Sequence, residues 1–377
     1  MIYFDNAATT YPKPQSVINA VNSAFVKYGA NPGRSGHKMS IETAAEVYSC
    51  REAAAELFGS SSPQNVVFTQ NCTGSLNLCI KGVLRQGDHA VISDLEHNSV
   101  LRPMHSLQQK GIITYDIAQT YIDDEKTVNS FEAKIKTNTK LIVCTHASNA
   151  FGLRLPIERL AQLCKSYGIL FAVDAAQTAG CLKINIEKTG IDFLCMPGHK
   201  GLYGPSGTGI LICNNDLPLD TVFEGGTGSQ SLEYNQPDFL PDRLESGTLN
   251  TIGIIGLHAG INFIRQKGCD KLFAHESRLA KYIYAELAKN KKVKLYTPFS
   301  EKSLPVISFN IEGMSGEQTA QRLNENSIAV RGGFHCAPLA HQKFGTLKTG
   351  TARISLGAFN TANEAEKFCQ IIKKLTN

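Results

Sequence analysis

Tryptophan is absent from this 377-residue sequence, and no run of five or more Lys or Arg residues occurs. The net charge of +5 is small for this length, and the basic residues are scattered, which gives little support to a nucleic-acid or membrane-surface partner. No apolar stretch approaches the roughly 20 residues that a membrane-spanning helix requires. We therefore expect a soluble protein with no nucleic-acid and no membrane partner. The small positive charge is compatible with an anionic cofactor.

A CxxC pair is also missing, although the sequence has 11 cysteines at irregular spacing. The first residues do not resemble a secretory leader, so we expect a reducing, cytoplasmic compartment with free thiols. His335, Cys336 and His341 lie close together in sequence, but no second ligand cluster has the spacing of a zinc site, and we predict no metal. Most of the cysteines lie in apolar or helical patterns and are expected to be small buried residues: Cys50, Cys79, Cys144, Cys164, Cys181, Cys195, Cys213 and Cys369.

Short apolar runs alternate with helical patterns through the first two thirds of the chain. Examples of the helical patterns are Ser75–Arg85, Ser99–Lys110 and Pro156–Tyr167. Several of the runs are apolar at consecutive positions, as parallel strands covered on both faces are. The alternation predicts an α/β domain with a mostly parallel sheet of seven strands. The predicted strands are Asn65–Thr69, His89–Ser93, Ile112–Ile117, Lys140–Thr145, Ile169–Asp174, Asp192–Met196 and Gly209–Cys213.

After about Asn250 the pattern changes to that of a smaller α+β domain. No Pro/Gly/Ser-rich spacer separates the two parts, so we place the boundary inside a long helix. The prediction is a large domain over residues 15–255 and a small domain over residues 256–377 together with 1–14. The elements expected in the second part are helices at Ile252–Ile264, His275–Lys289, Ser315–Asn326 and Asn363–Leu375, and strands at Pro305–Ile311, near Ile328–Arg331 and at Ala352–Leu356.

Two residues carry the strongest chemical signal. Asp174 ends a buried-type strand, where ligands of open α/β sheets gather, although an isolated Asp there is more often a simple helix cap. Lys200 follows the next strand within a Gly-rich bend, an unusual place for a solvated charge, and a buried Lys can act as an amine nucleophile. Pyridoxal 5'-phosphate (PLP) needs both a Lys for its aldehyde and an acid beside its pyridine nitrogen. The pair therefore predicts PLP as the cofactor.

A phosphate-binding turn is expected where the strand that ends at Thr69 meets a helix. Its residues, Gln70 to Ser75, are small and polar, and free amides at a helix N-terminus bind anions. An ordinary Ser or Thr cap is about as good an explanation of this segment alone. His97, after another strand, is in a position to stack on the pyridine ring, although a lone His is more often structural.

One cysteine differs from the others in its surroundings. Cys336 lies in the segment Val330–Pro338, outside any regular element and flanked by Gly, His and Pro, which is typical of an exposed loop. A neighbouring His335 or Arg331 would favour the thiolate, the nucleophilic form. We predict that Cys336 is a catalytic nucleophile and not a buried loop thiol.

Ten segments together make the sequence similar to the class V aminotransferase superfamily, and most similar to its group II cysteine desulfurases and selenocysteine lyases. In chain order they are YFDNAATT, NCTGSLNL, DLEHNSV, THASNAFG, VDAAQ, GHKGLYGPSGTG, FEGGTGS, RLESGTLNTIGIIGL, RGGFHCAP and RISLGAFNT. The resemblance spans nearly the whole chain, and the desulfurase assignment depends chiefly on RGGFHCAP. It implies the PLP-dependent fold type I.

The resemblance also implies roles for individual residues. Lys200 would carry PLP, with Asp174 at the pyridine nitrogen, Gln177 at the phenolic oxygen and His97 on the ring. Cys72, Thr73 and His199 would face the phosphate, and Thr227 would reach the phosphate of a neighbouring subunit in a homodimer with shared sites. Asn149, Arg331 and Arg353 would bind the substrate, with the Arg353 guanidinium as a two-pronged carboxylate clamp. Cys336 would attack the substrate sulfur and hold a persulfide.

The expected reaction converts L-cysteine to L-alanine, and a sulfur-acceptor protein is a further partner of such chemistry. Four departures from the family pattern concern the phosphate and sulfur sites. Pro197 stands where the family often has Ser or Thr, and Cys72–Thr73–Gly74 replaces Thr–Thr–Glu. Phe334 stands where a second His is frequent, and APLAH follows the cysteine in place of a longer stretch. The alternatives are a selenocysteine lyase acting on L-selenocysteine, another class V aminotransferase or lyase, and a non-catalytic scaffold protein.

Overall fold

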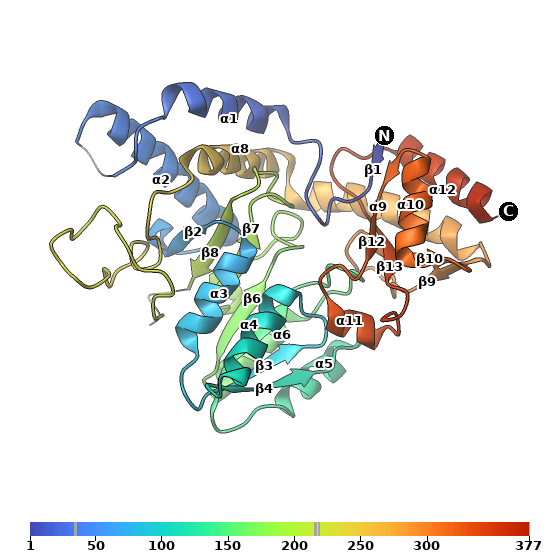
Figure 1. Ribbon diagram of the computed structural model, residues 1–377, viewed down its shortest axis with the longest axis horizontal. Coiled ribbons are helices and arrows are strands. Elements are labelled where there is room, and N and C mark those ends of the chain that lie inside the picture. The colour runs from blue at the N-terminus through green and yellow to red at the C-terminus, as the bar shows by residue number, and fades with distance from the viewer. Residues whose placement is uncertain (34–35, 215–216, 218, 377) are drawn as a thin grey trace.

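The computed structural model describes residues 1–33, 36–214, 217 and 219–376 (Figure 1). Its largest unit is a seven-stranded sheet in which β8 pairs antiparallel with both of its neighbours and all other pairs are parallel. This confirms the predicted α/β class and the mostly parallel sheet. The strands, in spatial order, are β2 (Val66–Thr69), β8 (Gly209–Cys213), β7 (Phe193–Pro197), β6 (Leu170–Asp174), β5 (Thr139–Thr145), β3 (His89–Ser93) and β4 (Thr114–Ala118).

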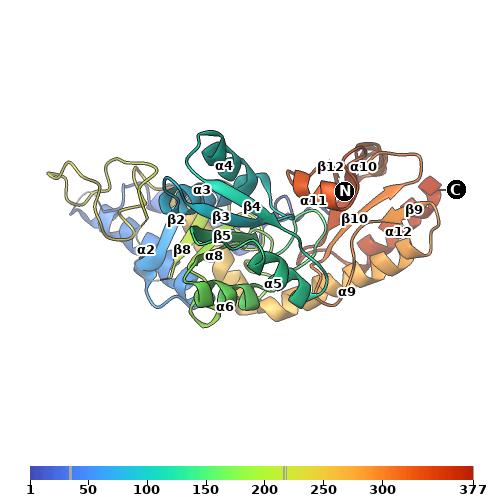
Figure 2. The ribbon, with the colours of Figure 1, turned by 90° about the horizontal axis from the view of Figure 1, so that it is seen from below.

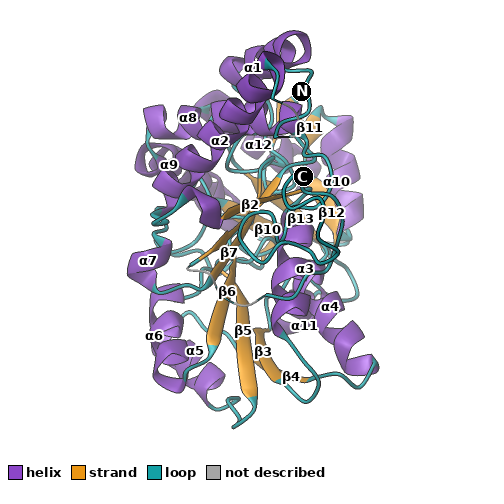
Figure 3. Ribbon diagram, turned by 90° about the vertical axis from the view of Figure 1, so that its left-hand side faces the viewer, coloured by secondary structure: helices purple, strands orange, loops and turns teal. Residues whose placement is uncertain are grey.

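Helices cover both faces of this sheet, as Figures 2 and 3 show. Alternate residues of one strand enter different cores: Ala90 and Ile92 of β3 pack with α3 (Cys72–Val83) and α4 (Asn98–Gln109), whereas Val91 packs in the core of the opposite face. Burial on both faces explains why these strands are apolar at consecutive positions. The opposite face is covered by α2 (Lys38–Phe58), α5 (Asp124–Glu132), α6 (Ile157–Tyr167) and α8 (Thr251–Lys267), and the short α7 (Ile186–Thr189) and the 3-10 helix η1 (Pro63–Asn65) complete this part.

The C-terminal part forms a smaller four-stranded antiparallel sheet, seen at the right of Figure 1. Its strands, in spatial order, are β12 (Arg331–Gly333), β13 (Thr351–Ser355), β10 (Val306–Ile311) and β9 (Val293–Leu295), accompanied by α10 (Gly316–Glu325), α11 (Pro338–Lys343) and α12 (Ala362–Thr376). The strand expected near 328–331 is in fact two strands. β11 (Ile328–Ala329) pairs with the N-terminal β1 (Ile2–Tyr3), and β12 belongs to the four-stranded sheet.

The connection between the two parts runs through α8 and α9 (Cys269–Ala288). Leu257 and Ile264 of α8 are buried in the core of the large sheet, and α1 (Gln15–Lys27) and α2 pack on this helix. Leu279 and Ile283 of α9 are buried in the core of the smaller part. The domain limits stay a prediction, and this packing favours a division within α9 over one at residue 255. None of the described helices is long and apolar enough to cross a membrane.

Candidate active site

The carboxyl ends of the central strands meet at a cavity of about 210 Å³. β5 ends at Thr145, β6 ends at Asp174, and the segments that follow β3 and β7 bring His97 and Lys200 to the same edge of the sheet. Eight residues predicted from sequence line this cavity, in the position where open α/β sheets bind ligands. They are Cys72, Thr73, His97, Asn149, Asp174, Gln177, His199 and Lys200.

Lys200 lies in a turn whose backbone is closely packed. A Cβ atom on Gly198 would lie 2.1 Å from Thr208 Oγ1, and one on Gly201 would lie 2.3 Å from the Ala179 carbonyl oxygen, so both positions require glycine. The Tyr203 amide donates to the Lys200 carbonyl over 2.8 Å and closes the turn. Burial lowers the pKa of the Lys200 amine, and the nearby Asp174 carboxylate opposes this shift. The amine can therefore lose its proton more easily than a solvated lysine.

Asp174 is 3% exposed, and its side chain accepts two hydrogen bonds. The Ala176 amide donates to Oδ1 over 2.8 Å, and the Cys72 thiol donates to the same oxygen over 3.5 Å. Burial and the Asp174 charge raise the pKa of Cys72 well above its usual value, so this thiol stays protonated. Cys72 therefore contacts the carboxylate, whereas the resemblance led us to expect it at the phosphate.

His97 is held in one tautomer by the start of α4. Its Nδ1 accepts the backbone N–H of Ser99 over 3.0 Å, so in the neutral ring the proton lies on Nε2. Burial lowers the pKa of His97 and favours this neutral form. The Ser99 hydroxyl lies 2.7 Å from Nδ1 and 2.9 Å from Thr73 Oγ1, which links the ring to the start of α3. Ser99 lines the cavity, although no role was expected for it from the sequence.

The N-terminus of α3 borders the cavity and suits an anion. Asn71 caps the helix by accepting the Gly74 amide over 2.9 Å, which leaves the amides of Cys72 and Thr73 without an intrahelical acceptor. His199 lies on the same cavity, and its buried Nδ1 has no hydrogen-bond partner among the described residues. Burial lowers the pKa of His199 to about 4. A phosphate would give this nitrogen and the two amides the partners that they lack, so these residues fit PLP.

Three residues assigned to the substrate or to the cofactor already have protein partners: Arg353, Asn149 and Gln177. Arg353 is completely buried, with Nη1 donating to the Asn149 carbonyl over 2.9 Å and Nη2 donating to Asp5 Oδ1 over 2.7 Å. The Asn149 side-chain amide donates to the His335 carbonyl over 2.7 Å. Gln177 donates to the Ala7 carbonyl over 3.1 Å. Asp5 is thus a partner of the substrate site that the sequence did not indicate.

The Cys336 loop is held beside this cavity, whereas Cys336 itself lines a separate cavity of about 570 Å³ with Asn98 and Phe334. The Asn98 amide, next to His97, donates to the Cys336 carbonyl over 2.8 Å, and Asn149 holds the carbonyl of His335. His335 and Cys336 both have left-handed backbone conformations, with φ of +50° and +57°. For residues with a Cβ this costs about 1–2 kcal/mol each, and such conformations gather at functional sites.

Cys336 is the one exposed cysteine in the part of the chain that the structure describes. The Arg331 guanidinium donates to its Sγ over 3.8 Å. The expectation that His335 would also assist the thiolate is wrong, because the buried His335 ring points inward, with Nε2 3.0 Å from Thr351 Oγ1. Burial lowers the pKa of His335 to about 2, so it carries no charge. Of the eight cysteines that we predicted to be buried, Cys181 is partly exposed and the other seven are buried.

Two further expectations concern residues outside the cavity. Thr227 lines a separate cavity with Arg51 and Asp242, so a single chain does not bring it to Lys200. No group of three or more His, Cys, Asp or Glu side chains in the described ranges could hold a metal ion.

Glu96 is a second residue near the site for which no role was expected from the sequence. It is completely buried, and its Oε1 accepts the Thr145 amide over 2.8 Å and the Ser93 hydroxyl, which joins the ends of β5 and β3. Burial raises the pKa of Glu96 to about 8, and the Asp174 charge adds to this shift. Its position in the sequence could have indicated a role, because this acidic residue directly precedes His97 just after a strand of buried residues.

Comparison with known proteins agrees with this arrangement. Residues 2–368 match the family described as Aminotransferase class-V. The chain belongs to this family. Among its relatives, a probable cysteine desulfurase of Pyrococcus abyssi is 34% identical over 100% of this chain and 94% of its own length. One from Methanothermobacter thermautotrophicus is 31% identical over 99% of this chain and 94% of its own length.

Solved structures of class V proteins have the same fold. The apo structure of a cysteine desulfurase from Thermococcus onnurineus superposes with a TM-score of 0.92 at 33% identity, covering 100% of this chain and 94% of the other. The S-sulfonic acid form of the cysteine desulfurase CsdA from Escherichia coli gives a TM-score of 0.88 at 25% identity, covering 99% and 94%.

Proposed function

We propose that this chain is a PLP-dependent cysteine desulfurase, which converts L-cysteine to L-alanine and retains the sulfur as a persulfide on Cys336. The observation that carries the proposal is the position of this thiol. It is exposed, contacts Arg331, and lies in a loop that is held by Asn98 and by Asn149, a residue that lines the cavity with Lys200. The relatives named cysteine desulfurases support the same assignment.

The cofactor site is proposed from the groups that surround the cavity. Lys200 would hold PLP covalently, Asp174 would keep a proton on the pyridine nitrogen, and His97 would lie on the ring. Thr73, His199 and the amides at the start of α3 would bind the phosphate, and Gln177 would reach the phenolic oxygen. When bound, PLP supplies an electron sink for the pair of electrons released at the substrate Cα.

The chain's own residues would carry the remaining steps. Arg353, Arg331 and Asn149 would orient the substrate carboxylate. The Lys200 amine, which the substrate amine would displace from the cofactor and which burial makes less basic, would then take the Cα proton. Cys336 Sγ then forms a bond to the substrate sulfur while the Cβ–S bond breaks. The electron pair of the broken bond would stay on Cβ, which takes up a proton to replace the one that the Cys336 thiol has lost. Lys200 would return its proton to Cα, so that alanine leaves.

The same proposal includes a homodimer, a sulfur-acceptor protein and a cytoplasmic location. Because Thr227 lies away from Lys200 within one chain, a homodimer in which it reaches the partner's phosphate site would explain its place in the family pattern. An acceptor protein would remove the sulfur from Cys336, and a reducing cytoplasm would keep the thiol free. L-Selenocysteine remains the alternative substrate.

The test compares the parent with Cys336→Ala on L-cysteine and on L-selenocysteine. The variant should lose nearly all alanine formation from L-cysteine, because sulfur needs a nucleophile to accept it, and should keep much of its selenocysteine activity. Mass spectrometry should find one added sulfur on the Cys336 peptide of the parent. Cys269→Ser, at the start of α9, is the control and should retain the parent's activity. Normal turnover of L-cysteine by Cys336→Ala, with no persulfide in the parent, would disprove the proposal.

A further inference from the structure

Residues 2–13 form an N-terminal strap that crosses from the smaller part of the molecule to the Lys200 turn. At one end β1 pairs with β11, and the Phe4 ring is buried in the core of the smaller part. At the other end, the Thr10 amide and the Lys13 ammonium both donate to the His199 carbonyl, over 3.2 and 2.7 Å. The strap is therefore fixed at both ends.

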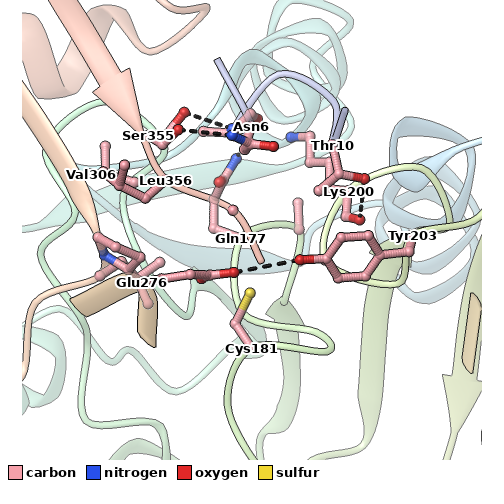
Figure 4. A pocket seen from close by; sticks show the side chains of 16 residues that line it. Asn6, Thr10, Gln177, Cys181, Lys200, Tyr203, Glu276, Val306, Ser355 and Leu356 are labelled. Carbon is pink, nitrogen blue, oxygen red and sulfur yellow. Dashed lines mark hydrogen bonds between the residues drawn. The ribbon is translucent and has the colours of Figure 1, made fainter. Parts of the chain in front are cut away.

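The middle of the strap is fixed beside β13. The Ser355 amide donates to the Phe4 carbonyl over 2.8 Å, and the Ala7 amide donates to Ser355 Oγ over 2.8 Å. The Asn6 side chain donates to the Ser355 carbonyl over 3.1 Å, and Figure 4 shows this contact. Asp5 lies between these anchors, so its backbone has one position relative to Arg353, which is two residues before Ser355.

Asp5 and Arg353 form an ion pair that does not itself line the cavity but contacts Asn149, which does. The Asp5 side chain is 21% exposed and that of Arg353 is fully buried. Because Nη2 donates to Asp5 and Nη1 donates to the Asn149 carbonyl, both terminal nitrogens of the guanidinium already have an acceptor. This differs from the free two-pronged clamp that the resemblance implied.

Two buried polar atoms near this pair still lack a partner. Arg353 Nε and Asn149 Oδ1 have no hydrogen-bond partner among the residues that the structure describes. A buried polar atom without a partner costs about 1–3 kcal/mol, so a ligand that supplies one is favoured. A carboxylate oxygen is the acceptor that a guanidinium N–H binds most strongly.

On the basis of the proposed function, we infer that Asp5 is a positioning residue of the substrate-carboxylate site. It holds Arg353 by Nη2 and so fixes the plane of the guanidinium, whose Nε has no protein partner in the described residues and would donate to the substrate carboxylate. The Asp5 charge also compensates the buried guanidinium, and a buried pair that loses one partner leaves an uncompensated charge.

The experiment measures the affinity of the PLP-loaded protein for L-alanine, from the change in the cofactor's absorbance. Asp5→Ala should raise the dissociation constant about tenfold, because the guanidinium loses one of its two fixed contacts. Asp5→Asn keeps an oxygen acceptor without the charge and should raise it about threefold. Asp270→Ala removes an exposed carboxylate paired with Lys183 and should match the parent.

Sodium formate supplies the signature that a general loss of stability would not give. In Asp5→Ala a formate ion can occupy the place of the missing carboxylate, so about 50 mM formate should lower the dissociation constant for L-alanine, whereas equal sodium chloride should not. In the parent, formate should leave the affinity unchanged or weaken it, because it competes for Arg353 Nε. The apo form of Asp5→Ala should also gain thermal stability from formate more than the apo parent does.

Three results would overturn the inference: unchanged affinity in both Asp5 variants, tighter L-alanine binding in either, or no effect of formate on Asp5→Ala. Tighter binding would mean that Asp5 competes with the substrate for Arg353. If Asp5→Ala does not fold, an Asp5→Asn affinity equal to the parent's is sufficient to reject it. L-Alanine binding does not need Cys336, so failure of desulfuration and failure of this inference are separate outcomes.

Discussion

The guanidinium of Arg331 donates to Sγ of Cys336 over 3.8 Å, whereas the ring of His335, the residue next to this cysteine, points into the protein. The charge beside the thiol is therefore that of an arginine and not that of an imidazole. An arginine remains charged at any pH at which the enzyme would work, so its effect on the thiol is permanent. A histidine with a pKa of about 2 cannot supply such a charge.

Replacing Arg331 by Ala should slow the alkylation of Cys336 by iodoacetamide at neutral pH. A unit charge about 4 Å away in water contributes about 1 kcal/mol to a thiolate, which corresponds to roughly a fivefold change in rate. The rate is measured by mass spectrometry of the Cys336 peptide. Arg322→Ala, which removes an exposed arginine paired with Glu325, should react like the parent. An equal rate in Arg331→Ala would mean that the 3.8 Å contact has no influence on the thiol.

Purified protein loaded with PLP should be yellow, and borohydride should attach the cofactor to Lys200. The reason is that Lys200 is the buried amine that lines the cavity opposite Asp174, with a pKa lowered by burial. Peptide mapping identifies the labelled lysine. Lys13, whose pKa burial lowers to about 8, is the informative competitor, because it binds the His199 carbonyl. Label on Lys13 or on another lysine would contradict the assignment.

Asp174→Asn should still bind PLP but lose turnover by about a hundredfold or more. A neutral amide cannot hold the proton on the pyridine nitrogen, and an interaction that acts mainly in the transition state affects kcat more than binding. Steady-state kinetics and cofactor absorbance separate the two effects. Asp192→Asn, at the amino end of β7, is the matched control, since its Oδ2 accepts the Phe171 amide far from Lys200 along the strand. A kcat near the parent's in Asp174→Asn would show that Asp174 is not needed to keep the pyridine nitrogen of PLP protonated.

Local sequence was sufficient to predict the parts of the site that follow strands. The predicted ends of the large-sheet strands lie within two residues of the observed ones, because burial on both faces leaves a continuous apolar run. Asp174 and Lys200 were found as the residues that interrupt such runs at the carboxyl end. The antiparallel direction of β8 has no such signature, because a strand buried on both faces is equally apolar in either direction.

The relationships that sequence could not predict join residues far apart in the chain or depend on backbone angles. Asp5 pairs with Arg353 across 348 positions, and the pairing follows from how β1 and β13 are placed by the fold. The inward orientation of the His335 ring depends on the left-handed backbone conformation of this residue, which the sequence motif RGGFHCAP does not reveal. Cys72 contacts Asp174 because the start of α3 lies beside the end of β6.

Glu96→Gln should flatten the dependence of stability on pH between about pH 5 and pH 8. Burial raises the pKa of Glu96 to about 8 in the folded chain, above the usual value of 4.5. Over this range the folded state keeps a proton that the unfolded state has lost, so the stability that Glu96 contributes is complete below about pH 4.5 and is lost as pH rises toward 8. Three pH units correspond to at most about 4 kcal/mol.

The measurement is the difference in the denaturant midpoint between about pH 5 and pH 8. Glutamine keeps an oxygen that can accept the Thr145 amide but cannot ionise, so the parent should lose more stability than Glu96→Gln over this interval. Glu276 is also buried, with its pKa raised to about 8, so a similar slope from Glu276 remains in both proteins. Glu301→Gln, at an exposed site, should follow the parent. Identical pH dependence in parent and Glu96→Gln would mean that Glu96 is ionised in the folded protein, with its charge stabilised by Ser93 and the Thr145 amide.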